Sequence, residues 1–307
     1  MTTDSHHEPS FRPPDSLTTS TYAVDTKYLN SELARILSQD RMLNAHLPLL
    51  PPDVELREDA RVLDVACGPG GWVCELAFHH PQMQVIGVDI NAQLIEYART
   101  TAQVQGLDNA VFQVMNVVSG FATPTPSSSV SVSSHSLDFP DAHFDCVNGR
   151  FLVSFLKTEW WPKLVREMVR VTRPGGVVRL TETNGFDLII TASPAMQRYK
   201  QILNQTFERD HRMTVLTPYL GPWLKGAGCT NVRTEAYLID FAPDSQEYEA
   251  IYRNIEVAYY ELMDLVLKVD PTFTREELEE AYRQCLIAMD QPDFCGQWFC
   301  ASAWGRV

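Results

Sequence analysis

The feature that most limits the fold is an alternation of short apolar runs with longer stretches of helical pattern, which begins at residue 61. Strands joined through helices of this length form right-handed crossovers, and these build a mostly parallel sheet. The expected strands are residues 62–65, 85–88, 110–115, 144–148, 176–181, 232–241 and 297–304. We therefore predict an α/β fold: a mostly parallel seven-stranded sheet with helices on both faces, its last strand antiparallel beside the sixth, and a helical cap.

The rest of the chain divides by composition. Residues 1–21 are rich in Pro, Ser, Thr and charged side chains and have almost no apolar residue to anchor them, so we expect a disordered tail. Residues 22–52 repeat apolar side chains at helical spacing until Pro51 and Pro52, which predicts a helical lid. A Ser-rich insertion and two sets of cap helices then interrupt the main domain. The expected parts are the tail 1–21, the lid 22–52, the main domain 53–307, the insertion 118–136 and the cap helices around 183–225 and 246–290.

Charge and composition exclude some partners. The formal charge of -14 disfavours nucleic acid and anionic lipid, which need clustered Lys and Arg. No apolar run reaches the roughly 18 residues of a membrane span, and the polar first residues do not resemble a secretory signal. We therefore expect a cytoplasmic chain without a membrane or nucleic-acid partner. The 7 cysteines form no CxxC pair and the histidines are scattered, so we expect buried free thiols and no metal site.

A strand, an acidic residue, a Gly-rich turn and a helix start follow one another in VLDVACGPGG, residues 62–71. Gly68 and Gly70 permit positive φ and allow a ligand to lie against bare backbone, beside the free amides of the helix start. Asp64 ends the first strand and can accept hydrogen bonds from an ammonium group or from loop amides. Asp89 ends the second strand, where an α/β nucleotide site places a carboxylate for both ribose hydroxyls.

A dinucleotide-dependent oxidoreductase is the main alternative from this pattern. Its fingerprint requires a third glycine three positions after the second, and Val73 occupies that place.

The ordered motifs resemble those of class I methyltransferases, over roughly residues 60 to 240. VLDVACGPGG resembles their motif I and VIGVD (85–89) their acidic motif II, while FQVMN (112–116), FPDAHFDCVNGR (139–150) and RVTRPGGVVRLTE (170–182) resemble their later strand motifs. The resemblance implies S-adenosyl-L-methionine as cofactor. Two departures are Asn116, where the family usually has Asp, and Ala66, where it often has Gly. The implied cofactor residues are Asp64, Ala66, Gly68, Gly70, Asp89, Ile90, Asn116, Val117 and Asn148.

The helical stretch before the core resembles the N-terminal segment of small-molecule methyltransferases of secondary metabolism, in which a Tyr and a Gln close over the cofactor. That similarity makes Tyr22 and Gln39 candidates for cofactor binding. The alternative is that both are ordinary residues of a helix surface.

The sequence says less about the methyl acceptor. The expected partner is a small, largely apolar or aromatic molecule methylated on oxygen, nitrogen or carbon. The sequence also leaves open whether the chain forms a homodimer. If the acceptor is a phenol or alcohol, a base such as Glu182 or His211 would assist. A non-catalytic regulator with this fold is the other class of function. Candidate acceptor-binding residues, which fall off the core stripes or near loops, are Trp160, Trp161, Trp223, Asn254 and Tyr260.

Overall fold

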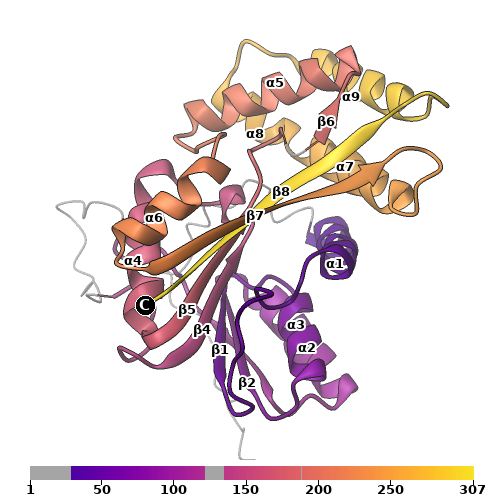
Figure 1. Cartoon of the computed structure of the whole chain (residues 1–307). Helices are drawn as coiled ribbons and strands as arrows, with labels where there is room; N and C mark the ends of the chain where they lie inside the picture. The colour runs from indigo at the N-terminus through magenta and orange to yellow at the C-terminus, as the bar shows by residue number, and fades with distance from the viewer. Residues whose placement is uncertain (1–28, 122–134, 188) are drawn as a thin grey trace, which may run out of the picture.

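A computed structural model describes residues 29–121, 135–187 and 189–307 of the chain (Figure 1). The expected tail, Tyr22 and most of the Ser-rich insertion lie outside these residues.

The described residues form one eight-stranded sheet in the order β3-β2-β1-β4-β5-β8-β6, with β7 paired to the other edge of β8. The strands β3, β2, β1, β4 and β5 are parallel to one another, and β8 is antiparallel to β5, β6 and β7. This confirms the predicted mostly parallel sheet with an antiparallel last strand. The strands are β1 (Arg61–Val65), β2 (Gln84–Asp89), β3 (Ala110–Val114), β4 (Phe144–Arg150), β5 (Thr172–Glu182), β6 (Ile189–Thr191), β7 (Thr230–Phe241) and β8 (Gly296–Arg306).

The predicted count of seven strands is wrong by one. The additional strand, β6, has three residues and lies in a segment expected to be helix and loop. A run this short shows no alternation in the sequence, and it exists because β8 extends beyond β5 and offers its backbone to Ile189, Ile190 and Thr191.

Helices cover both faces of the sheet (Figure 1). On one side α2 (Gly71–His79) packs on β2 and α3 (Ala92–Gln105) on β2 and β3. On the other side α4 (Trp161–Val171) packs on β4 and β5, and α6 (Leu220–Gly226) on β7 and β8. The side chain of Asn91 caps α3 by accepting hydrogen bonds from the amides of residues 93 and 94.

A helical cap stands beyond the carboxyl ends of the parallel strands, around the far ends of β7 and β8 (Figure 1). Residues 246–269 hold two helices, α7 (Tyr248–Glu261) and α8 (Met263–Val269). A capping box of Thr274 with Glu277 is present at the start of α9 (Arg275–Met289). The helix α1 (Leu29–His46) packs against α7 and α2, and thereby connects the cap to the sheet. The cap helices are α5 (Pro194–Arg209), α7 (Tyr248–Glu261), α8 (Met263–Val269) and α9 (Arg275–Met289).

All seven cysteines are free thiols; Cys295 is exposed and the other six are buried, as the sequence predicted for most of them. Across the described ranges, no helix is both long and apolar enough to cross a membrane.

Candidate functional site

A cavity of about 270 Å³ lies where the sheet meets the cap. In the strand order, β1 lies between β2 and β4: from β1 the chain continues to one side through β2 and β3, and then returns to the other side at β4. Ligands of open α/β sheets bind beyond the carboxyl ends of the strands where the strand order reverses in this way. We name its two parts by their linings. The strand-end half is formed by Asp64, Ala66, Cys67, Gly68, Asp89, Ile90, Asn91, Leu94, Met115, Asn116, Val117 and Val118. The cap half is formed by residues of α1, α5, α7 and β8 and of the loops after β4 and β5.

The Gly-rich turn gives the strand-end half its floor. Gly68 has φ 55° and lines the cavity, so its backbone is open to a ligand. Gly70 has φ 81° but is not in the cavity lining. A Cβ on Gly70 would lie 2.5 Å from the Phe112 ring, so this glycine permits the close packing of the turn against β3.

Asp89 lies opposite the turn. Its carboxylate accepts hydrogen bonds from the backbone amide of Gly68 at 3.0 Å and from that of Asn91 at 2.8 Å. Burial raises the pKa of Asp89, and these amides oppose the rise. Asp89 thus fixes the turn while its side chain lines the cavity.

Asp64 belongs to a buried polar network at the ends of β1 and β4. Its carboxylate accepts a hydrogen bond from the Asn148 side-chain amide at 2.8 Å. Burial raises the pKa of Asp64 to about 7, although Arg150 and Asn148 favour the ionised form. Arg150 also donates to Asp40 of α1 at 3.1 Å and to Asn44 at 3.0 Å. Asn148 is fully buried and reaches the cavity only through Asp64.

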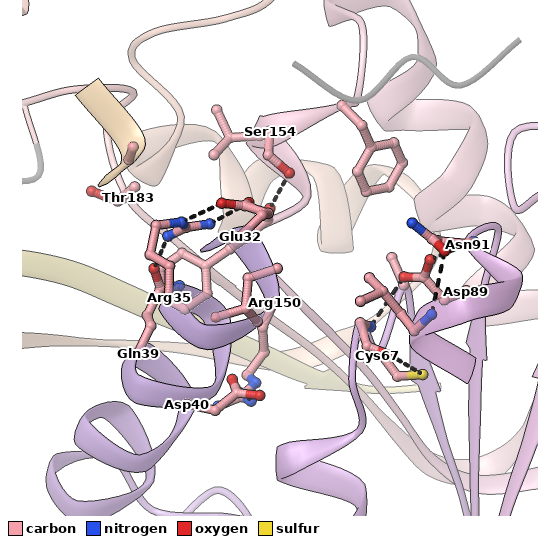
Figure 2. A pocket seen from close by; sticks show the side chains of 18 of the residues that line it. Glu32, Arg35, Gln39, Asp40, Cys67, Asp89, Asn91, Arg150, Ser154 and Thr183 are labelled. Atoms are coloured by element: carbon pink, nitrogen blue, oxygen red, sulfur yellow. Dashed lines mark hydrogen bonds and ion pairs between the residues drawn. The ribbon is translucent and has the colours of Figure 1, made fainter. Parts of the chain in front are cut away.

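Sequence reasoning missed Arg150, although one signal was present: a cation ends a buried parallel strand. Figure 2 shows Arg150 next to Asp40, with Asp89 and Asn91 on the opposite side of the view. All four residues line the cavity. No local sequence pattern predicts the pairing of Arg150 with Asp40, because the two residues are 110 positions apart.

The helix α1 forms a polar wall of the cap half. Arg35 donates to both carboxylate oxygens of Glu32 at 2.6 Å and to the Gln39 side-chain oxygen at 2.8 Å. Gln39 also accepts a hydrogen bond from Asn254 of α7 at 3.0 Å. The structure therefore brings the two predicted candidates Gln39 and Asn254 together at the cavity.

The remaining wall of the cap half is apolar. Phe186 and Phe207 pack edge to face with ring centroids 4.8 Å apart, and Phe186 and Tyr259 do so at 6.3 Å. Ile255, Leu262 and Trp298 extend this wall; Phe151 and Phe155 line the cavity from the loop after β4.

Glu182, the predicted base, does not line the cavity. It is fully buried, and its carboxylate accepts hydrogen bonds from the amides of Leu152 at 2.6 Å and Val153 at 3.4 Å. Burial raises the pKa of Glu182 well above its usual range. Through these hydrogen bonds Glu182 stabilises the loop after β4. His211 is an exposed residue beyond α5 and also lies outside the lining.

The candidate tryptophans pack into the core instead of the cavity. Trp161 is fully buried at the start of α4 and stacks on Trp223 of α6 with ring centroids 4.8 Å apart. Trp160 is buried in the same cluster, because α4 must cover β4 and β5. Tyr260 points away from the cavity and lies beside the ring of Tyr282, with ring centroids 5.8 Å apart.

Known proteins resemble this chain in both sequence and fold. Residues 62–176 match the profile of a family described as a methyltransferase domain. An uncharacterized methyltransferase of Bacillus subtilis, YcgJ, is 28% identical over 165 residues, which cover 54% of this chain and 55% of that protein. A tRNA (guanine-N(7)-)-methyltransferase of Botryotinia fuckeliana is 26% identical over 171 residues, covering 53% and 58%. The chain thus spans little more than half the length of these curated relatives.

Solved structures share the fold at low identity. Phosphoethanolamine N-methyltransferase 2 of Haemonchus contortus, in complex with S-adenosyl-L-methionine, has a TM-score of 0.53 at 16% identity, over 91% of this chain and 59% of that one. The [4+2]-cyclase SpnF has a TM-score of 0.51 at 15% identity, over 95% and 97%. Proteins named for two different reactions therefore share this architecture, which means that function has to be argued from the site.

Proposed function

This chain carries a class I S-adenosylmethionine-dependent methyltransferase domain, and from that premise we propose that it methylates a small, largely apolar or aromatic acceptor on oxygen, nitrogen or carbon. The observation that carries the proposal is the continuity of the cavity. An acidic, glycine-floored half at the strand ends opens directly into an aromatic half under the cap.

We assign the strand-end half to the cofactor because its hydrogen-bond acceptors fit that molecule. Asp64 offers a carboxylate to the ammonium group, and Asp89 can accept from both ribose hydroxyls. The amide oxygen of Asn116 can accept from the adenine amino group, and Ile90 and Val117 offer apolar contacts to the adenine ring. Gly68 leaves the backbone open for close approach. Ala66 lines the same half. In this proposal Gly70 acts indirectly, by letting the turn pack against Phe112. Asn148 also acts indirectly, by donating a hydrogen bond to Asp64.

Gln39 closes the cofactor end from α1 in this proposal, and Tyr22, outside the described residues, is proposed to assist it. The hydrogen bond from Asn254 holds the Gln39 side chain at the cavity wall. Closure by α1 would exclude water from the site, which the reaction requires.

The bound cofactor supplies an activated methyl group on its sulfonium. The chain's own task is to hold the acceptor's attacking atom in line with that methyl group and to keep water out. No described histidine lines the cavity, and Glu32 is paired with Arg35, so the lining favours acceptors that attack without a strong protein base.

The acceptor class follows from the cap half. Opposite the polar wall of α1, the lining is largely apolar and rich in aromatic rings. The lining cations Arg35 and Arg150 are paired with Glu32 and Asp40. A polyanion would find no cluster of Lys or Arg there, which disfavours nucleic acid as acceptor. A place in secondary metabolism forms part of the same proposal and rests on the sequence resemblance. A cytoplasmic location stays an expectation from the sequence.

Two measurements test this function. Calorimetry should show micromolar binding of S-adenosylhomocysteine, and a coupled assay should then detect turnover with members of a panel of phenols, amines, small acids, lipophilic ring compounds and bulk tRNA. Turnover confined to tRNA would overturn the acceptor class. Tight cofactor binding without turnover on any acceptor or metabolite extract would favour the non-catalytic regulator.

A further inference from the structure

The residue that directly follows β4, Phe151, has a left-handed backbone, with φ 53° and ψ 38°. In this region the Cβ of an L-residue crowds the next carbonyl oxygen, so the conformation costs free energy in a residue such as Phe. Of the five described non-glycine residues with positive φ, Phe151 alone has a large apolar side chain. Glycine adopts such a turn without strain, as Gly68 does at φ 55°. The Phe151 side chain therefore contributes something that offsets the strain in its backbone.

Hydrogen bonds on both sides hold this backbone in place. The Phe151 amide donates to the Thr181 carbonyl oxygen of β5 at 2.9 Å, and the Ser154 hydroxyl donates to the Phe151 carbonyl oxygen at 3.2 Å. The two amides that come next in the chain donate to the buried carboxyl group of Glu182. The surrounding groups thus fix a strained conformation, and residues held in this way cluster at functional sites.

The side chain of Phe151 lies on the cap side of the turn. It packs against the apolar cluster of the cap, whereas Leu152 and Val153 pack into the cluster on the sheet. Phe207 and Tyr259 of the cap cluster line the cavity, and so does Phe151 itself. Phe151 also remains partly exposed, so its packing on the cap leaves part of the residue available to a ligand.

Phe151 lies where the two halves of the cavity meet. The preceding residue, Arg150, pairs with Asp40 at 3.1 Å in the polar network around Asp64, which belongs to the strand-end half. One residue later, the Phe151 side chain contacts the apolar wall of the cap half. In the proposed function the methyl group passes from the first half to the second. A side chain at this junction therefore contacts the acceptor near its attacking atom.

We propose that Phe151 positions the methyl acceptor: its ring, held by the strained turn after β4, contacts an aromatic acceptor at the junction of the two halves. This inference rests on the proposed function, because it names the residue that selects the acceptor in the same cavity. Two aromatic rings gain an interaction beyond the area they bury, so Phe151 favours an aromatic acceptor over a saturated one of similar shape. Glu182, outside the lining, is then a positioning residue that acts through the turn.

The test uses two probes, 2-naphthol and trans-2-decalol, which share a bicyclic frame with one hydroxyl and differ in aromaticity. Binding is measured by calorimetry on protein saturated with S-adenosylhomocysteine. Phe151→Leu keeps an apolar side chain but removes the ring. We expect it to lower the ratio of 2-naphthol affinity to decalol affinity about three- to tenfold, and to leave S-adenosylhomocysteine affinity within about twofold. Phe151→Tyr, which retains the ring, should keep the wild-type ratio.

Phe294→Leu is the control, because Phe294 belongs to the same cap cluster but does not line the cavity. It should leave the ratio unchanged. An unchanged ratio in Phe151→Leu, or an equal fall in both leucine variants, would overturn the inference and leave the proposed function intact, since Phe151 would then only pack the cap.

A second measurement requires no variant to fold. In wild-type protein with ¹³C-labelled phenylalanine, bound 2-naphthol should show nuclear Overhauser contacts to the Phe151 ring, and contacts to other rings alone would overturn the inference. If neither probe binds the loaded protein, the apolar acceptor site falls together with the inference. If S-adenosylhomocysteine itself does not bind, the proposed function fails first.

Discussion

Gln39 of α1 and Asn254 of α7 are joined by a 3.0 Å hydrogen bond at the wall of the cavity, although 215 positions separate them in the chain. The same Gln39 oxygen accepts from Arg35, so one side chain connects the polar face of α1 to the cap. The position of α1 over the cavity is therefore coupled to α7.

Asn254→Ala should loosen this connection. Loss of one partly buried hydrogen bond costs about 1 kcal/mol, so we expect S-adenosylhomocysteine affinity to fall a few-fold and amide exchange in α1 to accelerate. Calorimetry and hydrogen exchange measure the two effects. Arg253→Ala is the control on the same helix, because Arg253 is exposed and pairs with Glu249 and Glu256 of α7 itself. Equal effects of the two variants would argue against the coupling.

Asp89→Ala should weaken cofactor binding by about 2 kcal/mol, or roughly thirtyfold, because two ribose hydroxyls lose a charged acceptor and the Gly68 amide loses its partner. Calorimetry with S-adenosylhomocysteine measures the change, and Asp108→Ala, at an exposed carboxylate before β3, provides the control. Unchanged affinity in the Asp89 variant would falsify the assignment of this residue.

Cofactor affinity should depend on pH through Asp64. Its pKa of about 7 lies above the ordinary value of 3.8, so between these values the folded chain without cofactor retains a proton that the unfolded chain releases. Stability from this group is thus present at low pH and is lost as pH rises toward 7. Binding an ammonium group requires the ionised carboxylate, so S-adenosylhomocysteine should bind about tenfold more weakly at pH 6 than at pH 8.

Calorimetry across this range, with Asp64→Asn as the comparison, isolates the effect. The variant should bind weakly at every pH, with a flatter profile than the wild type. A wild-type profile as flat as that of the variant would show that Asp64 does not ionise on binding.

Glu182→Ala should destabilise the fold by about 2 kcal/mol, since the amides of Leu152 and Val153 lose a buried acceptor. Glu182→Gln retains an oxygen at this place and resembles the neutral acid that the raised pKa favours, so it should keep most of the stability and the turnover. Urea unfolding and the methyl-transfer assay distinguish the alternatives. A Glu182→Gln variant that is stable and binds cofactor but does not turn over would restore Glu182 as a base.

Gly70→Ala should destabilise more than Gly106→Ala, although both glycines have positive φ, 81° and 69°. A Cβ on Gly70 would meet Phe112 at 2.5 Å, whereas one on Gly106 meets nothing within 4 Å. Left-handed strain costs each variant about 1 kcal/mol, and overpacking adds about 1–3 kcal/mol at Gly70 alone. Urea unfolding of the two variants gives the difference directly. Similar losses would mean that Phe112 moves aside at little cost.

The sequence by itself determined the parallel strands β1 to β5 and the Gly-rich turn. These features depend on local patterns: alternation sets a strand, a glycine permits positive φ, and an acidic residue after a strand lies at its carboxyl edge. Asp64, Gly68 and Asp89 could be placed for the same reason, since each lies at the carboxyl end of its own strand or just after it.

Only the tertiary structure decided how the acceptor half is built. The helical period that brings Tyr259 and Ile255 inward is the same whether a helix face meets the core or a cavity, and so sequence reasoning could not separate lining from packing. Trp161 entered the core instead, because α4 covers β4 and β5. Arg150 with Asp40, and Gln39 with Asn254, are brought together by chain crossings. No local pattern records such contacts, because their free energy comes from burial and pairing between distant segments.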